Sequence, residues 1–229
     1  MNQIFLTDDG SHSLISEAFG ETYHSKSGAI EETQFVYLDA GLAFVTAQGL
    51  SEINILEVGF GTGLNALMTF REAERLGLTI NYFAYEAFPI SMQQAQQFNY
   101  AEKLDMNPQV FHDIHAADWG EMYPLSNFFK IQKFEKTFDQ IDCQNLIHLI
   151  YFDAFDPKVQ PELWDETMMQ RMYNALKPNG VLTTYSAKGS VKRALRGVGF
   201  HVELLPGPPS KRHITRAIKV LHAESVTPT

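Results

Sequence analysis

The glycine-rich turn at residues 59–63 constrains the fold of this chain more than any other feature. In the stretch NILEVGFGTGLNALMTF (residues 54–70) an apolar run precedes three alternate glycines, and a pattern typical of an amphipathic helix follows them. A buried strand, a glycine turn and a helix, in this order, are how many α/β proteins hold nucleotide-like cofactors. The stretch therefore predicts an α/β fold with a cofactor site at this turn.

The rest of the chain repeats the alternation of apolar runs and helical patterns. Strands are predicted at 53–57, 80–86, 110–112, 146–153 and 181–186, and helices at 63–76, 91–103, 161–176 and 188–197. Such alternation predicts a doubly wound, mostly parallel sheet with helices on both faces. The sequence KPNG at 177–180 is predicted to end the helix at 161–176 before the strand at 181–186 begins.

The two ends of the chain depart from this alternation. Two apolar runs at 200–207 and 212–223 have no helix between them, which predicts a C-terminal antiparallel hairpin and fits a Rossmann-like methyltransferase sheet. At the other end, residues 4–15 predict a hairpin around Asp9-Gly10, and a helix is expected to begin near Ile30. We therefore expect two parts: an N-terminal extension (1–50) that closes the site, and a methyltransferase domain (51–229). No element is assigned within 115–145.

Composition restricts the class of protein. The chain has 229 residues, 45% of them hydrophobic, which is enough for one well-filled core. It contains no apolar run of the ~20 residues needed to cross a bilayer, and no secretory signal pattern at its start. Cys143 is its single cysteine, which excludes an internal disulfide and a Cys-rich zinc site. We expect a soluble, cytoplasmic protein.

Charge is distributed unevenly along the chain. The net charge is −9, yet the stretch from Lys177 to Lys219 holds nine Lys or Arg residues and one acid, Glu203. This stretch is either an ordinary solvated face or a local patch that binds phosphates, which the overall charge would conceal.

The spacing of the glycines favours one cofactor over another. The dinucleotide fingerprint requires a glycine where this chain has Leu64. The observed pattern is an acid, Glu57, followed by glycines at 59, 61 and 63. S-adenosylmethionine has no pyrophosphate to bind, and its ammonium and sulfonium would meet a carboxylate near the turn. The pattern therefore favours S-adenosylmethionine, with glycine allowing close approach of the backbone.

Acidic residues stand at the ends of three successive predicted strands: Glu57, Glu86 and Asp113. Glu86 ends the second strand, where a carboxylate accepts hydrogen bonds from both ribose hydroxyls. Asp113 follows the predicted third strand and is placed to accept from the adenine amino group, with Ile114 packing on the ring. The carboxyl ends of parallel strands form one edge of a sheet, where ligands of open α/β folds bind. These residues support the same cofactor.

The fourth strand ends in IYFDAFDPKVQPELW (150–164) and predicts the substrate side of the site. Asp153 is expected beside the sulfonium, where a carboxylate would orient a substrate ammonium and accept its proton. The aromatic face of Phe155 also favours a cation. Asp156 is either a second carboxylate of the site or the opening of an Asp-Pro turn.

Five segments together resemble the methyltransferase half of the MnmC family, which makes 5-methylaminomethyl-2-thiouridine in tRNA; its stand-alone form is called MnmD. They are YHSKSGAIEETQFVYL, GFGTGLN, YEAFP, FDAFDPKVQPELW and GFHVELLPGPPSKRHITRA. The resemblance extends from about residue 20 to residue 220. It implies methylation of the 5-aminomethyl group of a wobble uridine, with S-adenosyl-L-methionine as cofactor and tRNA as substrate.

The resemblance also implies roles for particular residues. The methionine end of the cofactor would lie against the turn, and the segment containing EET would close over the active site. The implied cofactor residues are Gly59, Gly61, Thr62, Gly63, Asn65 and Glu86; the implied catalytic residues are Asp153, Glu31, Glu32 and Tyr23; and the implied tRNA contacts are Lys211 and Arg212. Glu31 and Glu32 are alternatively an ordinary pair of acids at the N-terminus of a helix. The charge distribution and the aromatic face add Lys188, Lys192, Arg193 and Phe155 to the residues expected to contact tRNA.

Two departures from the family stand out. Asp156 occupies a position where the family commonly has a small residue, and the flavin oxidase domain of the bifunctional relatives does not follow here. We therefore expect a separate enzyme to supply the aminomethyl nucleoside.

Two other functions remain open. An aminopropyltransferase of the spermidine synthase type also has an Asp and an Asp-Pro after its fourth strand, although its glycine turn usually contains an Asp that GFGTG lacks. A non-catalytic tRNA-binding module on the same scaffold would have no physical reason to keep the acids at 57, 86, 113 and 153.

Overall fold

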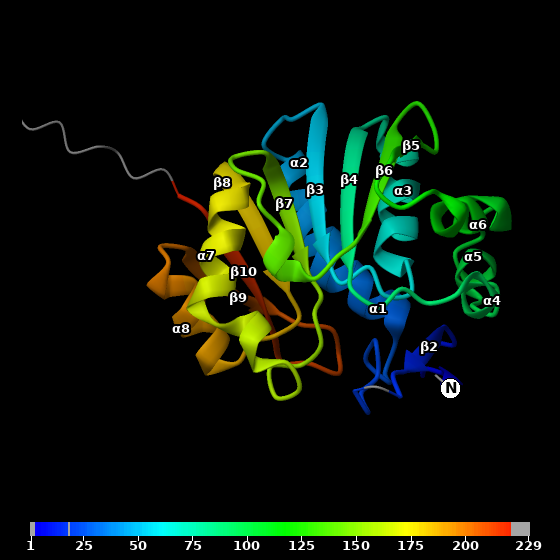
Figure 1. Ribbon diagram of the computed structural model, residues 1–229, viewed down its shortest axis with the longest axis horizontal. Coiled ribbons are helices and arrows are strands. Elements are labelled where there is room, and N and C mark those ends of the chain that lie inside the picture. Colours follow the sequence, from blue (N-terminus) through cyan, green and yellow to red (C-terminus); the bar gives the residue numbers. More distant parts are fainter. Residues whose placement is uncertain (1–2, 18, 221–229) are drawn as a thin grey trace, which may run out of the picture.

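A mixed eight-stranded sheet forms the centre of the protein, as the computed structural model shows for residues 3–17 and 19–220 (Figure 1). In spatial order its strands are Met122–Pro124 (β5), Phe129–Glu135 (β6), Thr79–Glu86 (β4), Glu52–Val58 (β3), Ile147–Phe152 (β7), Leu176–Thr184 (β8), His213–Ile218 (β10) and His201–Pro206 (β9). Strands β6, β4, β3, β7 and β8 are parallel, whereas β5 and β10 run antiparallel to their neighbours. The predicted Rossmann-like methyltransferase fold is confirmed.

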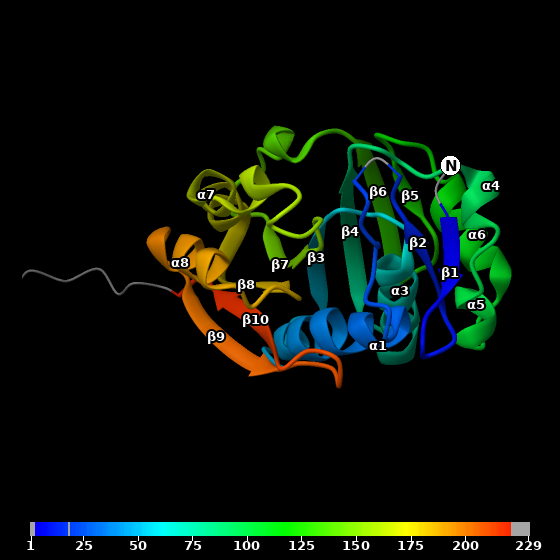
Figure 2. The ribbon, with the colours of Figure 1, turned by 90° about the horizontal axis from the view of Figure 1, so that it is seen from below.

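Both faces of the sheet are covered by helices. One face packs against the helical segment Ala29–Thr46 and α3 (Leu64–Leu76), and the other against α7 (Glu166–Ala175) and α8 (Gly189–Gly197) (Figure 2). Alternate residues of β3 enter the two cores: Ile55 packs on the first face and Leu56 on the second. This burial on both faces explains why the central strands are nearly continuous apolar runs.

The helical segment Ala29–Thr46 is continuous but changes its winding. It begins as α1 (Ala29–Thr33), continues as a nine-residue π-helix (Gln34–Leu42) and ends as α2 (Ala43–Thr46). The start near Ile30 is confirmed. Before it, the predicted N-terminal hairpin is present as β1 (Gln3–Leu6) and β2 (His12–Ile15), which form a separate antiparallel pair.

The region after β4 differs from the prediction. The stretch 110–112 is not a strand, because Asn107 caps and Pro108 begins a helix, α6 (Pro108–Ala116). The helix expected at 91–103 is two short helices, α4 (Met92–Ala95) and α5 (Tyr100–Lys103). The third parallel strand is β6, within the stretch that received no assignment.

Strand β8 also begins earlier than expected. Its pairing with β7 is interrupted, with Leu176 opposite Ile147 and Val181 opposite Leu149, so residues 177–180 form an irregularity inside the strand rather than a stop before it. The C-terminal hairpin is confirmed as β9 and β10; residues 221–223 of the predicted run lie outside the described residues. Among the described residues, no helix has the length and apolar character needed to span a membrane.

Candidate active site

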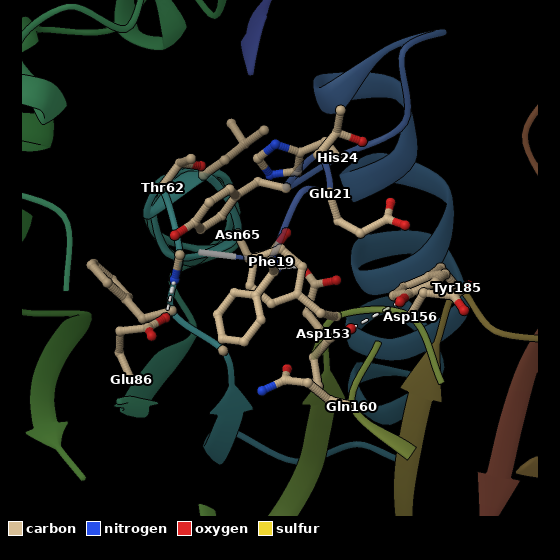
Figure 3. Close-up of a pocket in the computed structure, with 18 of the residues that line it drawn as sticks. Phe19, Glu21, His24, Thr62, Asn65, Glu86, Asp153, Asp156, Gln160 and Tyr185 are labelled. Carbon is tan, nitrogen blue, oxygen red and sulfur yellow. Dashed lines mark hydrogen bonds between the residues drawn. The ribbon is translucent and has the colours of Figure 1, made fainter. Parts of the chain in front are cut away.

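A cavity of about 190 Å³ lies at the carboxyl edge of the parallel strands. Its floor is the glycine turn between β3 and α3, and its walls come from the ends of β4 and β7. The N-terminal segment 19–25 and the loop before β10 complete it (Figure 3). Of the residues predicted for the site, those on the cavity wall are Tyr23, Glu32, Gly59, Gly61, Thr62, Asn65, Glu86, Asp153, Phe155 and Lys211.

The backbone of the glycine turn approaches its surroundings closely. Gly59 has φ +92°, and a Cβ there would lie 2.7 Å from the backbone oxygen of Asp153. Gly61 has φ +52°, and a Cβ there would lie 3.0 Å from the ring of Tyr23. A side chain at Gly59 would collide with the backbone, one at Gly61 would crowd the Tyr23 ring, and the positive φ would strain both. The turn therefore leaves bare backbone exposed to the cavity.

Glu86 joins the end of β4 to this turn. Its two carboxyl oxygens accept hydrogen bonds from the backbone N–H groups of Gly61 and Phe88, each at 2.9 Å. The side chain is 9% exposed, and burial raises its pKa even though the backbone bonds favour the charged form. Each oxygen retains a lone pair, so Glu86 is equipped to accept from two hydroxyl groups of a ligand. That it binds ribose stays a prediction.

Asp153 and Glu57 share one amide group. The Asn65 side-chain nitrogen donates to Asp153 Oδ2 and to Glu57 Oε1, at 2.9 Å in both cases. Thr33 donates to the Asn65 oxygen at 2.9 Å. Asp153 lies on the cavity wall, and burial raises its pKa to about 7.

Glu57 is not on the cavity wall. The pattern predicted that its carboxylate meets the cofactor, but the side chain is 0% exposed. It points to the face of the sheet that carries Ile55, because the two residues are two positions apart on one strand. In this structure the Glu57 side chain therefore does not lie on the surface that a ligand in this cavity would touch.

Aromatic rings gather beside Asp153. The ring centroid of Phe155 lies 4.8 Å from that of Phe19 and 5.1 Å from that of Tyr23, and Phe19 lies 6.0 Å from the exposed ring of Phe88. Burial raises the pKa of Tyr23, so its hydroxyl stays protonated. Flat apolar faces therefore surround the cavity beside a carboxylate.

Glu32 and Lys211 form an ion pair across the cavity. Glu32 also accepts from the backbone N–H of Ser25 at 2.8 Å, and Lys211 Nζ lies 4.2 Å from the ring centroid of Tyr185. Lys211 thus faces the cavity, although the sequence assigned it to tRNA phosphates. Glu31, which was predicted to act in catalysis together with Glu32, is not on the wall; it lies in the first turn of α1.

The other basic residues lie outside the cavity lining. Lys188, which precedes α8, forms an ion pair with Asp156 on the cavity wall. Lys192 and Arg193 lie on α8, and Arg212 is exposed before β10. Lys188 is therefore already paired, whereas Arg193 and Arg212 are open to solvent.

The residues predicted for the adenine side lie away from this cavity. Asp113 lies on α6, bound by the Gln109 side chain at 2.7 Å, and neither it nor Ile114, which is fully buried, lines the cavity. Gly63 lies against His115 of the same helix. Phe138, which follows the true third strand, lines the cavity instead. The alternating apolar residues of 129–135 were the signal that could have located it.

Several other wall residues were not anticipated from the sequence. They are Phe19, Glu21, His24, Gln160 and Tyr185 (Figure 3). His24 is buried against Ser13, and burial lowers its pKa to about 4, so it is neutral. His24 and Gln160 lie within two of the quoted segments, but no role was assigned to them, and Phe19, Glu21 and Tyr185 lie outside all five segments.

Known proteins resemble this chain over most of its length. A family model described as S-adenosyl-L-methionine-dependent methyltransferase matches residues 126–220. The tRNA 5-methylaminomethyl-2-thiouridine biosynthesis bifunctional protein MnmC of Aromatoleum aromaticum is 27% identical over 93% of this chain and 35% of its own length; that of Paracidovorax citrulli is 29% identical over 85% and 32%. The chain spans about a third of the length of these curated relatives.

Solved structures show the same fold. MNMC2 from Aquifex aeolicus superposes with a TM-score of 0.77 at 24% identity, covering 95% of this chain and 70% of that one. Spermidine synthase from Thermotoga maritima gives 0.55 at 15% identity, covering 96% and 73%. These matches show that the chain has the fold of S-adenosyl-L-methionine-dependent methyltransferases, with the glycine turn, Glu86 and Asp153 at one sheet edge, and that over most of its length it is similar to the MnmC proteins.

Proposed function

We propose that the protein is a tRNA N-methyltransferase that converts 5-aminomethyl-(2-thio)uridine at the wobble position to 5-methylaminomethyl-(2-thio)uridine. The observation that carries this proposal is Asp153, a carboxylate on the cavity wall between the glycine turn and a cluster of aromatic rings. The names of the MnmC relatives support tRNA as the substrate. A tRNA substrate in turn implies a cytoplasmic site of action.

The cavity fits S-adenosyl-L-methionine. The bare backbone at Gly59 and Gly61 accommodates close approach of the methionine end, and the free lone pairs of Glu86 suit two ribose hydroxyls. Phe88 and Phe138 on the same side of the cavity offer apolar faces to a base. When bound, this cofactor supplies an electrophilic methyl group on a sulfonium.

Asp153 is proposed to manage the proton of the substrate amine. A primary aminomethyl group is mostly ammonium at neutral pH and has no lone pair to offer. The ionised Asp153 attracts the ammonium and accepts one proton, and the pKa of about 7 places the carboxyl in the range where such transfer is reversible. The Asn65 amide donates a hydrogen bond to Asp153 Oδ2 and so fixes the orientation of the carboxyl group, which leaves Oδ1 to accept the proton. Alignment of the amine then contributes as much as basicity.

The cavity carries a negative charge that suits this substrate. Five acidic side chains line it, namely Glu21, Glu32, Glu86, Asp153 and Asp156, and Lys211 is the one basic side chain on the described wall. Such a field favours a cation over a neutral uridine. The proposed phosphate contacts lie outside, on α8 and at Arg212, so the body of the tRNA and its modified base would meet surfaces of opposite charge.

The experiment is methyl transfer by the purified protein. Transfer RNA that carries 5-aminomethyluridine is incubated with methyl-labelled S-adenosyl-L-methionine, and nucleosides are resolved by mass spectrometry. We expect conversion of the aminomethyl nucleoside to the methylaminomethyl one, and none with tRNA that still carries the carboxymethylaminomethyl group. That second tRNA tests the need for a separate supplying enzyme, because its amine nitrogen carries a carboxymethyl group that must be removed before the methylaminomethyl nucleoside can form. Absence of transfer to the aminomethyl tRNA would contradict the proposal.

An aminopropyltransferase is the second candidate. Asp153 and Asp156 both line the cavity, as the Asp and Asp-Pro pair of such an enzyme would require. However, the ion pair with Lys188 already occupies Asp156. A thermal-shift comparison separates the candidates: a methyltransferase is stabilised more by S-adenosyl-L-methionine, and an aminopropyltransferase by its decarboxylated analogue.

A further inference from the structure

Glu57 is a completely buried acid whose role the proposed reaction leaves open. It lies on β3 one residue before the strand ends, is 0% exposed, and sits beneath the cavity floor rather than on it. An acid in such a position costs folding free energy unless it is paired or neutral. Within the described part of the chain no Lys or Arg forms an ion pair with it, so the acid has another reason to be there.

A single amide connects Glu57 to Asp153 on the cavity wall. The Asn65 side-chain nitrogen donates toward both Glu57 Oε1 and Asp153 Oδ2, at 2.9 Å each. The Thr33 hydroxyl occupies the Asn65 oxygen, and Asn65 is 3% exposed. The amide therefore cannot turn without losing a bond to one of three partners. Figure 3 shows Asn65 and Asp153 side by side at the cavity.

The second oxygen of Glu57 indicates which protonation state this arrangement stabilises. Glu57 Oε2 makes no well-formed hydrogen bond among the described residues. The hydroxyl of Tyr82 is its neighbour and favours the charged form of Glu57, but burial outweighs this effect. An anion with an unsatisfied buried oxygen is far more costly than a neutral acid. Burial raises the pKa of Glu57 well above its usual range, in agreement with a protonated carboxyl.

We propose that Glu57 is a positioning residue: held as the neutral acid, it fixes the Asn65 amide so that Asp153, and not Glu57, is the ionised carboxylate that faces the substrate amine. This inference rests on the proposed function for the identity of the amine, but its structural part does not depend on it. The two acids share the donors of one amide, with Glu57 in the neutral form and Asp153 in the charged form. Coupled buried carboxyls differ in protonation in this way when their surroundings differ.

Other titratable groups face the pair and belong to the same balance. Those around Glu57 are Tyr82 on β4, Tyr151 on β7 and Glu86 at the end of β4. Those around Asp153 are Tyr37 of the π-helix, Tyr185 after β8, Glu32 of α1 and Lys211 before β10. Burial raises the pKa of each of these tyrosines, so Lys211 is the one cation in this set, and it is already paired with Glu32.

The first test measures ionisation in the free protein, without any substrate. The protein is labelled with ¹³C at aspartate side-chain carboxyls, and the Asp153 signal, assigned by its loss in Asp153→Asn, is followed across pH. We expect Asn65→Leu to raise the Asp153 midpoint by about 1–2 pH units, because a bond to the charged form is removed. We expect Glu57→Gln to leave the midpoint in place, because one neutral group replaces another.

Two results of this titration would overturn the proposal. A fall of the Asp153 midpoint in Glu57→Gln would mean that Glu57 carries a negative charge in the native protein. An unchanged midpoint in Asn65→Leu would mean that the amide does not control Asp153.

The second test uses single-turnover methylation of aminomethyl tRNA. Glu57→Leu frees the Asn65 amide and should lower the rate by about tenfold or more through loss of alignment. Glu57→Gln should restore a rate within a few-fold of the native protein, and cofactor affinity by calorimetry should stay within a few-fold in both. A loss of cofactor affinity in Glu57→Gln, or a native rate in Glu57→Leu, would contradict a positioning role.

The matched control is Thr183→Val, which removes another buried hydroxyl without a partner, on strand β8 of the same described sheet. It should change neither midpoint nor rate. Thermal melts identify variants that do not fold; if Glu57→Leu is one, the isosteric Glu57→Gln and Asn65→Leu still decide. If the native protein does not methylate the tRNA at all, the proposed reaction fails while the titration still tests the pairing of the two acids.

Discussion

At the scale of single residues, the predictions that located the cavity were those for acids at the ends of clearly marked strands. Glu86 and Asp153 follow long apolar strands whose ends are clear in the sequence, and both reach the wall. Asp113 failed because Asn107 and Pro108, which begin a helix, were outweighed by a short apolar run. Glu57 failed for another reason: which of the two faces a strand residue takes cannot be known until the register of the sheet is fixed.

Replacement of Asp153 by Asn should separate binding from rate. Asp153→Asn keeps the shape and removes the charge, so we expect cofactor affinity within a few-fold and a methylation rate lower by ~10²–10⁴. In the native protein the rate should rise with pH through about 7, because the carboxyl must be ionised to accept a proton. The pH–rate profile of Asp153→Asn should lose that rise. A near-native rate would transfer the role to another acid of the wall.

Glu86→Ala tests the cofactor end of the same wall. The change removes an acceptor for two hydroxyl groups, and hydrogen bonds to charged groups contribute ~1.5–3 kcal/mol each. We expect the affinity for S-adenosyl-L-methionine to fall at least tenfold, as measured by calorimetry on a variant shown by circular dichroism to be folded. Unchanged affinity would remove Glu86 from the cofactor site.

At the scale of elements, the hairpin β1–β2 caps a helix that has no cap of its own. Gly28 precedes α1 and has no side chain, so the Asp9 carboxylate accepts from Glu31 N–H at 3.0 Å and the Ser11 hydroxyl accepts from Ala29 N–H at 3.2 Å. These bonds come from residues about twenty positions earlier, and no capping pattern in the sequence indicates them. The π-helix after α1 is equally hidden, because its residues lack the period of an α-helix.

Loss of this remote cap should destabilise the protein. Asp9→Ala leaves the first N–H groups of α1 without the carboxylate and should lower the free energy of unfolding by about 1 kcal/mol in urea denaturation. Although partial burial opposes it, hydrogen bonds from Ser11, Glu31 and Thr7 lower the pKa of Asp9, so its contribution is present above its ordinary pKa and is lost as the pH falls. The control is Asp8→Ala, an exposed neighbour. Equal stability of the two variants at neutral pH would argue against a capping role.

At the scale of the whole molecule, the order of the sheet could be predicted more completely than its edges. Alternation of strands and helices predicted the parallel centre, and two successive apolar runs without a helix between them predicted the C-terminal hairpin. Strand β6 was missed because Lys133 occupies one of the buried positions of its otherwise alternating pattern. That lysine is 1% exposed, with its ammonium 4.8 Å from the ring centroid of Trp119 and bound to the backbone oxygen of His115 at 2.6 Å. A buried cation of this kind depends on contacts that the sequence does not reveal.

Charge on α8 should determine the salt dependence of tRNA binding. Reversal of Lys192 and Arg193 to Glu should weaken binding and reduce the slope of log affinity against log salt by about one for each phosphate that the variant no longer neutralises. The control reverses Arg75 and Lys130, exposed residues near the edge opposite the cavity, and should leave the slope unchanged after correction for net charge. Equal slopes for the two double variants would show α8 to be an ordinary solvated face.

The ion pair between Glu32 and Lys211 joins residues 179 positions apart. On a ribosome, the chain emerges with its N-terminus first, so the segment that roofs the cavity exists long before the lysine that completes the wall. Until then the rings of Phe19, Tyr23 and Phe155 border an open edge of the nascent protein. A chain that ends before Lys211 therefore lacks part of the cavity wall and leaves this aromatic surface open to solvent.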